Sequence, residues 1–151
     1  KKIKSKYKVF FVGSGNLKEV SFLKKKILKN NLSNNIKIIK YINKDSLIIL
    51  SNFDLFLSLT RDFEGFGYSI AEALYVGTPV ISTKVGGVTE YLNRKNSELI
   101  KPMETKKLTK LLKNFKKDRK KWKTKIAYGK KLISYKYNSE IMSEKYFKLL
   151  K

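Results

Sequence analysis

The sequence contains neither cysteine nor histidine among its 151 residues. Disulfides, thiolate metal sites and imidazole chemistry are therefore excluded within this chain. No stretch approaches the roughly 18 continuous apolar residues of a membrane-spanning helix. The apolar run at residues 9–12 is too short for a signal peptide and ends at a glycine turn. We expect the protein to reside in the cytoplasm.

Arginine is scarce although the chain is strongly basic. Of 35 basic residues only Arg61, Arg94 and Arg119 are arginine, and the formal net charge is +23. Readers of nucleic acid rely on the forked guanidinium group, so no nucleic-acid partner is expected. Three interpretations of the lysine excess stay open, namely a solvated surface, attraction to an anionic membrane surface, and nucleic-acid binding, and the sequence favours them in that order.

Lysine is missing from one long segment, residues 45–83, which holds one arginine and five acidic residues. Its charge is 1 − 5 = −4, so the rest of the chain carries +27. In so lysine-rich a protein, burial or chemistry must exclude solvated ammonium groups from this segment. The functional motifs are therefore expected within it.

Short apolar segments alternate with segments of helical periodicity, which predicts one α/β domain. We expect a Rossmann-like parallel sheet with helices on both faces. In such sheets ligands bind at the carboxyl ends of the strands, so the loops that follow strands are the candidates for a site. The predicted strands are residues 7–12, 36–39, 54–59 and 79–82, and the predicted helices are residues 17–29, 44–51, 68–76 and the chain from about 104 onward.

The segment EGFGYSIAEAL, residues 64–74, carries the most chemical information. Glu64, Gly65, Phe66 and Gly67 occupy a loop between a predicted strand and a helix that begins near Tyr68. Glycines let a backbone approach a ligand closely, and the start of a helix offers unpaired N–H groups and positive potential. This combination suits a phosphate, and a carboxylate beside it can accept hydrogen bonds from sugar hydroxyls.

Glu72 lies within that helix. The residues three and four positions away are Tyr68, Ser69, Tyr75 and Val76, none of which is a cation. Glu72 is therefore not expected to form a salt bridge along the helix. Hydrogen bonding to a ribose diol is the more obvious purpose of its carboxylate.

Residues 64–92, EGFGYSIAEALYVGTPVISTKVGGVTEYL, closely resemble the signature of the group 1 or family 4 glycosyltransferases, which are retaining enzymes that use nucleotide sugars. The hallmark is a pair of glutamates separated by seven residues, matched by Glu64 and Glu72. The resemblance continues through the Gly86-Gly87 pair, back to VGSGN at residues 12–16 and forward to Tyr-Asn-Ser at residues 137–139.

The resemblance implies a role for each matched residue. Glu64 would contact the donor sugar near the reacting carbon and act as the catalytic residue, and Glu72 would bind the ribose. The backbone around Phe66, Gly67, Tyr68 and Ser69 would hold the diphosphate, together with Gly65. The base would meet the backbone near Tyr41 and Ile42, and the loop containing Gly13 and Gly15 would form a wall of the donor cleft.

The resemblance also implies an architecture. The chain would be the C-terminal, donor-binding lobe of a two-lobe GT-B enzyme, with an N-terminal acceptor lobe elsewhere in the same polypeptide. The enzyme would transfer sugar from a nucleotide-diphosphate donor to a glycan or lipid-linked acceptor without a cofactor or metal, at the inner face of the plasma membrane. The isolated chain would be inactive. The rival interpretations are a nucleotide-sugar epimerase-like domain and a basic nucleic-acid-binding module without catalytic activity.

Four features allow two interpretations each. The Gly13-x-Gly15 turn is either a wall of the cleft or a plain turn. Phe66 either packs or stacks on a ligand. The Gly86-Gly87 pair either approaches the sugar or starts a short helix. An apolar series at helical spacing either packs on the domain or docks on a membrane surface; its members are Trp122, Ile126, Ile133 and Tyr137.

Overall fold

A computed structural model describes residues 7–40 and 46–150 of the chain. The chain divides into two compact units, residues 1–44 and residues 45–151, which are described separately. Every strand pair in the described residues is parallel, and helices connect the strands. The predicted Rossmann-like α/β fold is therefore confirmed.

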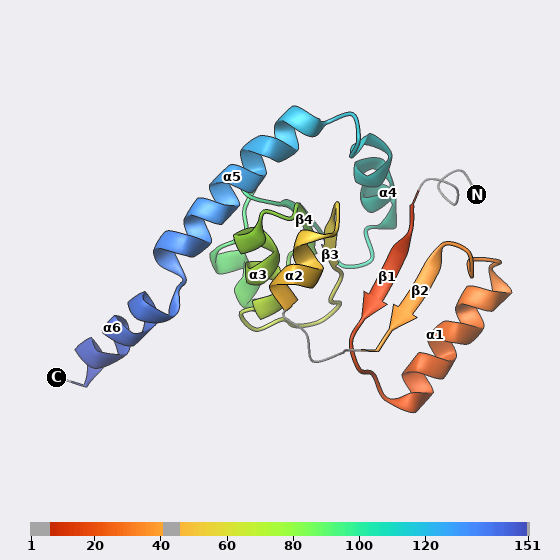
Figure 1. The fold of residues 1–151 in the computed structure, drawn as a ribbon, viewed down its shortest axis with the longest axis horizontal. Coiled ribbons are helices and arrows are strands. Elements are labelled where there is room, and N and C mark those ends of the chain that lie inside the picture. The colour runs from red at the N-terminus through yellow and green to blue at the C-terminus, as the bar shows by residue number, and fades with distance from the viewer. Residues whose placement is uncertain (1–6, 41–45, 151) are drawn as a thin grey trace. The chain divides into compact units, whose positions relative to one another are not determined.

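The first unit is a strand–helix–strand motif (Figure 1). Strand β1 (Val9–Val12) pairs with β2 (Ile36–Ile39) in parallel, and α1 (Leu17–Lys29) connects them. Asn16 begins the helix because its side-chain oxygen accepts a 2.8 Å hydrogen bond from the Glu19 N–H. The predicted bounds of α1 and β2 are confirmed, whereas β1 begins two residues later than predicted.

The second unit contains a three-stranded sheet of order β3-β4-β5, formed by β3 (Phe56–Ser58), β4 (Val80–Thr83) and β5 (Glu98–Ile100). All four residues of β4 are buried, as expected for a central parallel strand covered on both faces. Strand β5 was not predicted, because three residues that include a glutamate carry too little periodicity to be recognised.

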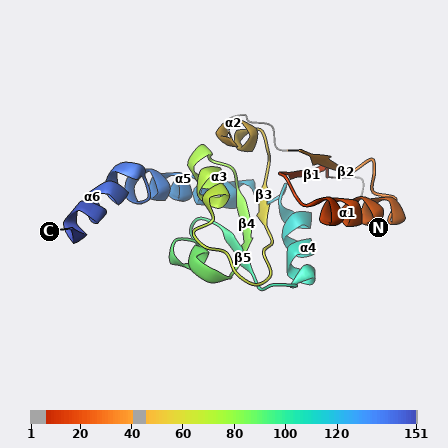
Figure 2. The ribbon, with the colours of Figure 1, turned by 90° about the horizontal axis from the view of Figure 1, so that it is seen from below.

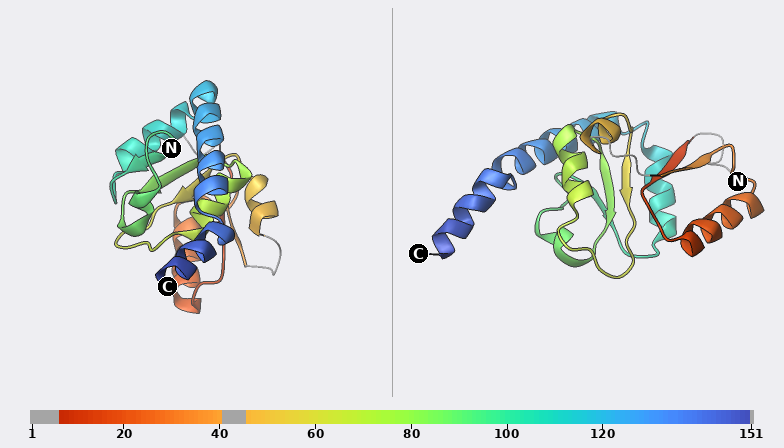
Figure 3. Two further views of the ribbon diagram at one scale, coloured as in Figure 1. Left: turned by 90° about the vertical axis from the view of Figure 1, so that its left-hand side faces the viewer. Right: turned by 60° about the horizontal axis from the view of Figure 1, so that its bottom comes forward.

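Helices cover both faces of this sheet. The helices of the unit are α2 (Ser46–Ser51), α3 (Tyr68–Val76), α4 (Thr105–Asn114), α5 (Arg119–Lys136) and α6 (Ser139–Leu149), with a short 3₁₀ helix η1 (Gly86–Glu90) after β4, and all but α6 lie against the sheet. The views in Figure 2 and in the right panel of Figure 3 show α3 and α4 on opposite sides of the strands. The predicted bounds of α3 are confirmed.

Two apolar cores follow from the alternation of side chains along β4. Val80 packs with α2, α3 and η1, whereas Ile81 packs with α4 and the start of α5. Helix α5 contributes to both cores, through Ile133 to the first and Trp122 to the second. Packing on the domain is therefore the confirmed interpretation of the apolar series in α5.

Helix α6 extends beyond the sheet at the end of α5 (Figures 1 and 2). Its large apolar side chains are exposed: Met142 by 54%, Tyr146 by 63% and Phe147 by 66%. The apolar series that docks on the sheet thus ends with α5, and α6 adds no buried residue to the unit.

A buried lysine links α5 to the segment before β5. Lys125 is only 6% exposed, and its ammonium group donates to the carbonyl oxygens of Arg94 and Ser97. It also lies 3.3 Å from the Glu98 carboxylate, which forms a second ion pair of 2.6 Å with Lys121. Burial is the largest influence on Lys125 and lowers its pKa, although Glu98 opposes the shift. Lys125 is therefore a structural residue that joins α5 to the segment before β5, and it is not part of the solvated lysine surface.

The Glu98 carboxyl makes the second unit sensitive to acid. Burial by itself would raise the pKa of Glu98, but the hydrogen bonds and charges of Lys121 and Lys125 outweigh burial and hold the pKa below 4.5. A carboxyl whose pKa is depressed by folding stabilises the folded state above its unfolded pKa, and this contribution disappears as the pH falls through the folded pKa. We therefore expect the free energy of unfolding to decrease as the pH falls below about 4.5.

The variant Lys121→Gln tests this expectation, because it removes one ion-pair partner of Glu98 and leaves the buried Lys125 in place. Urea unfolding between about pH 3 and pH 6.5 should show a smaller loss of stability in Lys121→Gln than in the wild type. The neighbouring exposed Lys120 is the control, since Lys120→Gln removes the same charge without touching Glu98. Equal pH profiles for all three proteins would show that the ion pair between Lys121 and Glu98 does not stabilise the fold.

Candidate functional site

The 64–67 loop follows β3 at the carboxyl end of the sheet and is anchored at its base by Thr83. The Thr83 hydroxyl donates a 2.6 Å hydrogen bond to the carbonyl oxygen of Thr60. The Thr60 hydroxyl in turn donates to the Glu64 carboxylate over 3.2 Å. The end of β4 therefore fixes the chain as it leaves β3, and Thr60 orients the half-buried side chain of Glu64.

Gly67 makes the transition from this loop into α3. It has the left-handed conformation (φ 73°, ψ 63°), and an added Cβ would lie 2.9 Å from Ile70 Cδ1 and 3.2 Å from Val88 Cγ1. Only glycine meets both constraints. Gly67 has no side chain to cap the helix, so the Tyr68 and Ser69 N–H groups at the start of α3 are available to an external acceptor, whereas those of Ile70 and Ala71 donate to the Gly67 carbonyl.

The Gly86-Gly87 pair packs against the backbone of the 64–67 loop. A Cβ on Gly86 would lie 2.1 Å from the Glu64 carbonyl oxygen, and one on Gly87 would lie 2.7 Å from that of Gly65. The Gly87 N–H donates a 2.9 Å hydrogen bond to the Glu64 carbonyl. Of the two interpretations of this pair, the start of a short helix is confirmed. The glycines also allow η1 to support the loop from close range.

Tyr91 follows η1 and is only 2% exposed. Its phenol donates a 2.7 Å hydrogen bond to the Phe66 carbonyl and lies 3.2 Å from the Gly67 carbonyl. Burial, followed by the charges of Glu64 and Tyr137, raises the pKa of the phenol, so Tyr91 stays a neutral donor. The sequence reasoning missed this residue, because no local pattern signals a hydrogen bond to a carbonyl 25 residues earlier in the chain.

The Phe66 ring lies within an aromatic cluster. Its centroid is 5.0 Å from that of Tyr91, 5.4 Å from that of Tyr68 and 5.8 Å from that of Tyr137. Phe66 also packs against the first apolar core. Packing is therefore the confirmed interpretation of Phe66, and the cluster ties the 64–67 loop to the end of α5.

Glu72 lines a pocket of about 460 Å³. One wall comes from α3, where Tyr68, Glu72 and Tyr75 lie one helical turn apart, and the other comes from the end of α5 and the start of α6. In residues 7–40 and 46–150, no cation forms an ion pair with Glu72. The pocket wall is completed by Leu47, Phe66, Ala71, Ile133, Ser134, Tyr137, Asn138, Ser139 and Glu140.

The structure brings some of the predicted site residues together. Phe66, Tyr68 and Glu72 share the pocket, whereas Glu64 is not part of its wall. Gly65, Tyr68 and Ser69 are exposed, as a ligand site requires.

The remaining predicted site residues belong to the first unit or fall outside the described chain. Gly13 and Gly15 follow β1, and the Gly13 N–H donates to the Ile39 carbonyl over 3.1 Å. Tyr41 and Ile42 lie outside the described residues. The proposed contact with the base therefore stays a prediction.

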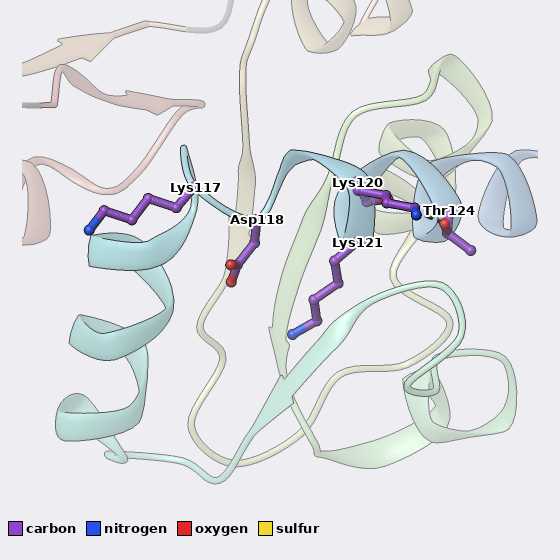
Figure 4. A pocket seen from close by; sticks show the side chains of 5 residues that line it. All are labelled: Lys117, Asp118, Lys120, Lys121 and Thr124. Atoms are coloured by element: carbon purple, nitrogen blue, oxygen red, sulfur yellow. Dashed lines mark hydrogen bonds between the residues drawn. The ribbon is translucent and has the colours of Figure 1, made fainter.

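A second hollow of about 470 Å³ lies where α4 meets α5 and is lined by Lys117, Asp118, Lys120, Lys121 and Thr124. Figure 4 shows that these side chains do not converge, since Lys117 and Lys120 point in opposite directions. Lys121 is engaged with Glu98. The hollow is therefore basic but offers no arrangement that would hold a small ligand.

Within residues 7–40 and 46–150, no group of three or more acidic, histidine or cysteine residues is placed to hold a metal ion. No helix in that part of the chain combines the length and apolar character needed to cross a bilayer.

The parallel sheets and their connecting helices have the architecture of one Rossmann-like lobe of a GT-B protein. Residues 1–132 match the sequence model of the family described as glycosyl transferases group 1, so the chain belongs to that family. Among curated protein sequences, none matches the chain significantly.

Solved structures share the fold. HepE from Anabaena in complex with UDP is 24% identical with a TM-score of 0.88, and the alignment covers 95% of this chain and 40% of HepE. The C-terminal domain of LpcC, a group 1 family protein from Francisella tularensis, is 20% identical with a TM-score of 0.72, covering 89% of this chain and 87% of that domain. A mutant of S. aureus TarM, in complex with fondaparinux, alpha-GlcNAc-glycerol and UDP, is 21% identical with a TM-score of 0.81, covering 97% of this chain and 30% of TarM.

Proposed function

We propose that the chain is the donor-binding lobe of a retaining glycosyltransferase and binds a nucleotide-diphosphate sugar. The observation that carries the proposal is the loop of residues 64–67. It lies at the carboxyl end of a parallel strand, ends in a left-handed glycine and leads into the uncapped N-terminus of α3. The UDP and UDP-glucose complexes of HepE support this choice of ligand.

Each polar group of the site has a part in this function. The amides at residues 65–69 hold the diphosphate, because they combine free N–H groups with the positive end of α3. Glu72 hydrogen-bonds the ribose from its pocket. Glu64 is the catalytic residue: it lies beside the transferred sugar, where positive charge develops as the glycosidic bond breaks. The predicted roles of Gly13, Gly15, Tyr41 and Ile42 toward the base belong to the same proposal.

The proposed reaction is a substitution on one face of the sugar, in which the donor phosphate assists removal of the acceptor proton. It requires no cofactor and no metal, because backbone amides and the helix dipole offset the phosphate charge. An epimerase-like function is disfavoured because this chain has no histidine for acid–base chemistry at the sugar.

The acceptor side of the reaction lies beyond the described site. We propose that the acceptor is a glycan or a lipid-linked sugar and that an N-terminal lobe of the same polypeptide binds it. The 40% coverage of HepE and the match to a C-terminal domain support one lobe of a larger enzyme. We further propose a cytoplasmic location at the inner face of the membrane, where the charge of +23 attracts anionic lipid.

A titration of the purified chain tests the proposed function. We expect UDP to bind weakly, in roughly the 10⁻⁴ to 10⁻³ M range, because one lobe supplies only part of the contacts. We expect no transfer of sugar from UDP-glucose to glycerol or glucose. The measurement is isothermal calorimetry for binding and a UDP-release assay for transfer.

The same preparation is titrated with duplex DNA, single-stranded RNA and anionic vesicles. Binding to anionic but not neutral vesicles, reversed by salt, is expected for the proposed location. Tight nucleic-acid binding without any response to UDP would replace the proposed function with that of a nucleic-acid-binding module. Turnover by the chain alone would show that no second lobe is needed.

A further inference from the structure

We propose that Tyr91 is a positioning residue for the donor site, and that its phenol hydroxyl aims the diphosphate-binding amides. This inference rests on the proposed function. Tyr91 follows η1 and reaches back under the 64–67 loop, where its hydroxyl donates to the Phe66 carbonyl over 2.7 Å and lies 3.2 Å from the Gly67 carbonyl.

Because the peptide bond is planar, a contact that fixes a carbonyl on one side of the loop also fixes the direction of an N–H group on the other side. In a planar trans peptide the C=O and the following N–H point in opposite directions. The Phe66 carbonyl shares a peptide plane with the Gly67 N–H, and the Gly67 carbonyl shares one with the Tyr68 N–H. The hydroxyl therefore directs the Gly67 N–H outward, toward the place of the diphosphate. At the next peptide it lies beside the Gly67 carbonyl, which the Ile70 and Ala71 N–H groups already hold over 2.9 and 3.1 Å, so that the Tyr68 N–H also points outward.

A second contact has the same effect two peptides earlier. The Gly87 N–H donates to the Glu64 carbonyl over 2.9 Å, which turns the Gly65 N–H outward. The segment of residues 86–91 therefore holds the 64–65 and 66–67 peptide planes from behind, and the first turn of α3 holds the 67–68 plane. Backbone N–H groups that point to one side of a loop can together bind an anion.

The rest of the Tyr91 environment shows why the hydroxyl can hold this position. The ring is 2% exposed and is packed between Phe66 and Tyr137, with centroid separations of 5.0 and 5.6 Å. The backbone carbonyl oxygen of Tyr91 also accepts a 2.8 Å hydrogen bond from the Asn96 side chain. Both the ring and the backbone of Tyr91 are thus immobilised, so the hydroxyl is a preorganised donor.

The test is Tyr91→Phe, which keeps the ring in the cluster and removes only the hydroxyl. The control is Tyr135→Phe, which removes the same atom from a side chain that is 75% exposed on α5. Calorimetry measures the dissociation constants of UDP and of uridine for each protein, and thermal melts show whether each variant is folded. Uridine lacks the diphosphate and so reports on base and ribose contacts alone.

We expect Tyr91→Phe to bind UDP roughly three- to tenfold more weakly than wild type, the effect of losing one hydrogen bond, while uridine binding is unchanged. Tyr135→Phe should match the wild type for both ligands. Equal weakening of UDP and uridine, or unchanged UDP binding, would overturn the inference. So would failure of Tyr91→Phe to fold, since the hydroxyl would then serve the fold as a whole. Absence of UDP binding by the wild type would instead refute the proposed function itself.

Discussion

Replacing Glu64 with glutamine is expected to lower kcat of the enzyme that carries this chain by roughly 10²–10³-fold, the cost of removing a preorganised electrostatic group. The substitution keeps the shape of the side chain and its ability to accept the hydrogen bond from Thr60, which spans 3.2 Å. It removes the negative charge that would stabilise the transferring sugar. The melting temperature should change little, because the side chain is only half-buried and Gln fills the same space.

Glu72→Gln is the matched companion, since it makes the same chemical change at the other glutamate. Glu72 lines the pocket beside α3, and the ribose that we place there does not change during the reaction. We therefore expect a higher KM for the donor with a smaller loss of kcat, the pattern of a contact made equally in ground and transition states. The measurements are steady-state kinetics and thermal melts of both variants. Unchanged activity, or a fall in the melting temperatures alone, would contradict the assignment.

Gly86→Ala is expected to destabilise the second unit by about 3 kcal/mol, because two costs combine. Gly86 has a φ of 57°, which an L residue adopts at a cost, and its Cβ would lie 2.1 Å from the Glu64 carbonyl oxygen. The contact is with backbone, so the loop itself must move. The melting temperature should fall by roughly 10 °C, and UDP binding should weaken together with it.

Gly65→Ala is the control for stability. An added Cβ at Gly65 meets nothing within 4 Å, and its φ is not in the left-handed region. This variant should melt within about 1 °C of the wild type, whatever its effect on the ligand. If both alanine variants melted alike, the close approach of η1 to the loop would not be a structural requirement.

The parts of the fold that the sequence predicted correctly have strong local signals. Helix α3 could be bounded to the residue because its apolar run follows Gly67 and stops at Gly77, which has the left-handed conformation of a helix C-terminus. Helix α1 and strand β2 were predicted equally well, since a glycine turn precedes α1, whereas β1 begins two residues later than predicted. Strand β5 was missed because it is short and its Glu98 is paired with lysines from a helix that comes later in the chain.

In the candidate site, too, the residues with a local sequence signal were predicted and those that act over long sequence distances were not. Glu64, Glu72 and the glycines between them were found from a local motif, and the structure places Glu72 in a pocket. Tyr91, Thr83 and the purpose of Gly86 were not predicted, because each acts on a segment more than 20 residues away through one hydrogen bond or one close contact. Such contacts depend on how β3 and β4 pair, which no local pattern contains.

The close approach of η1 to the 64–67 loop has a consequence for protein engineering. In this chain the carbonyls of Glu64 and Phe66 are held by hydrogen bonds from Gly87 and Tyr91. If the loop of a relative with different donor specificity were inserted alone, it would be separated from the residues that hold its own carbonyls. The graft would also have to keep the close approach of the two backbones, because a Cβ added at Gly86 would lie 2.1 Å from the Glu64 carbonyl oxygen. The transferable module is therefore the continuous stretch of residues 60–91, with strand β4 included, rather than the motif by itself.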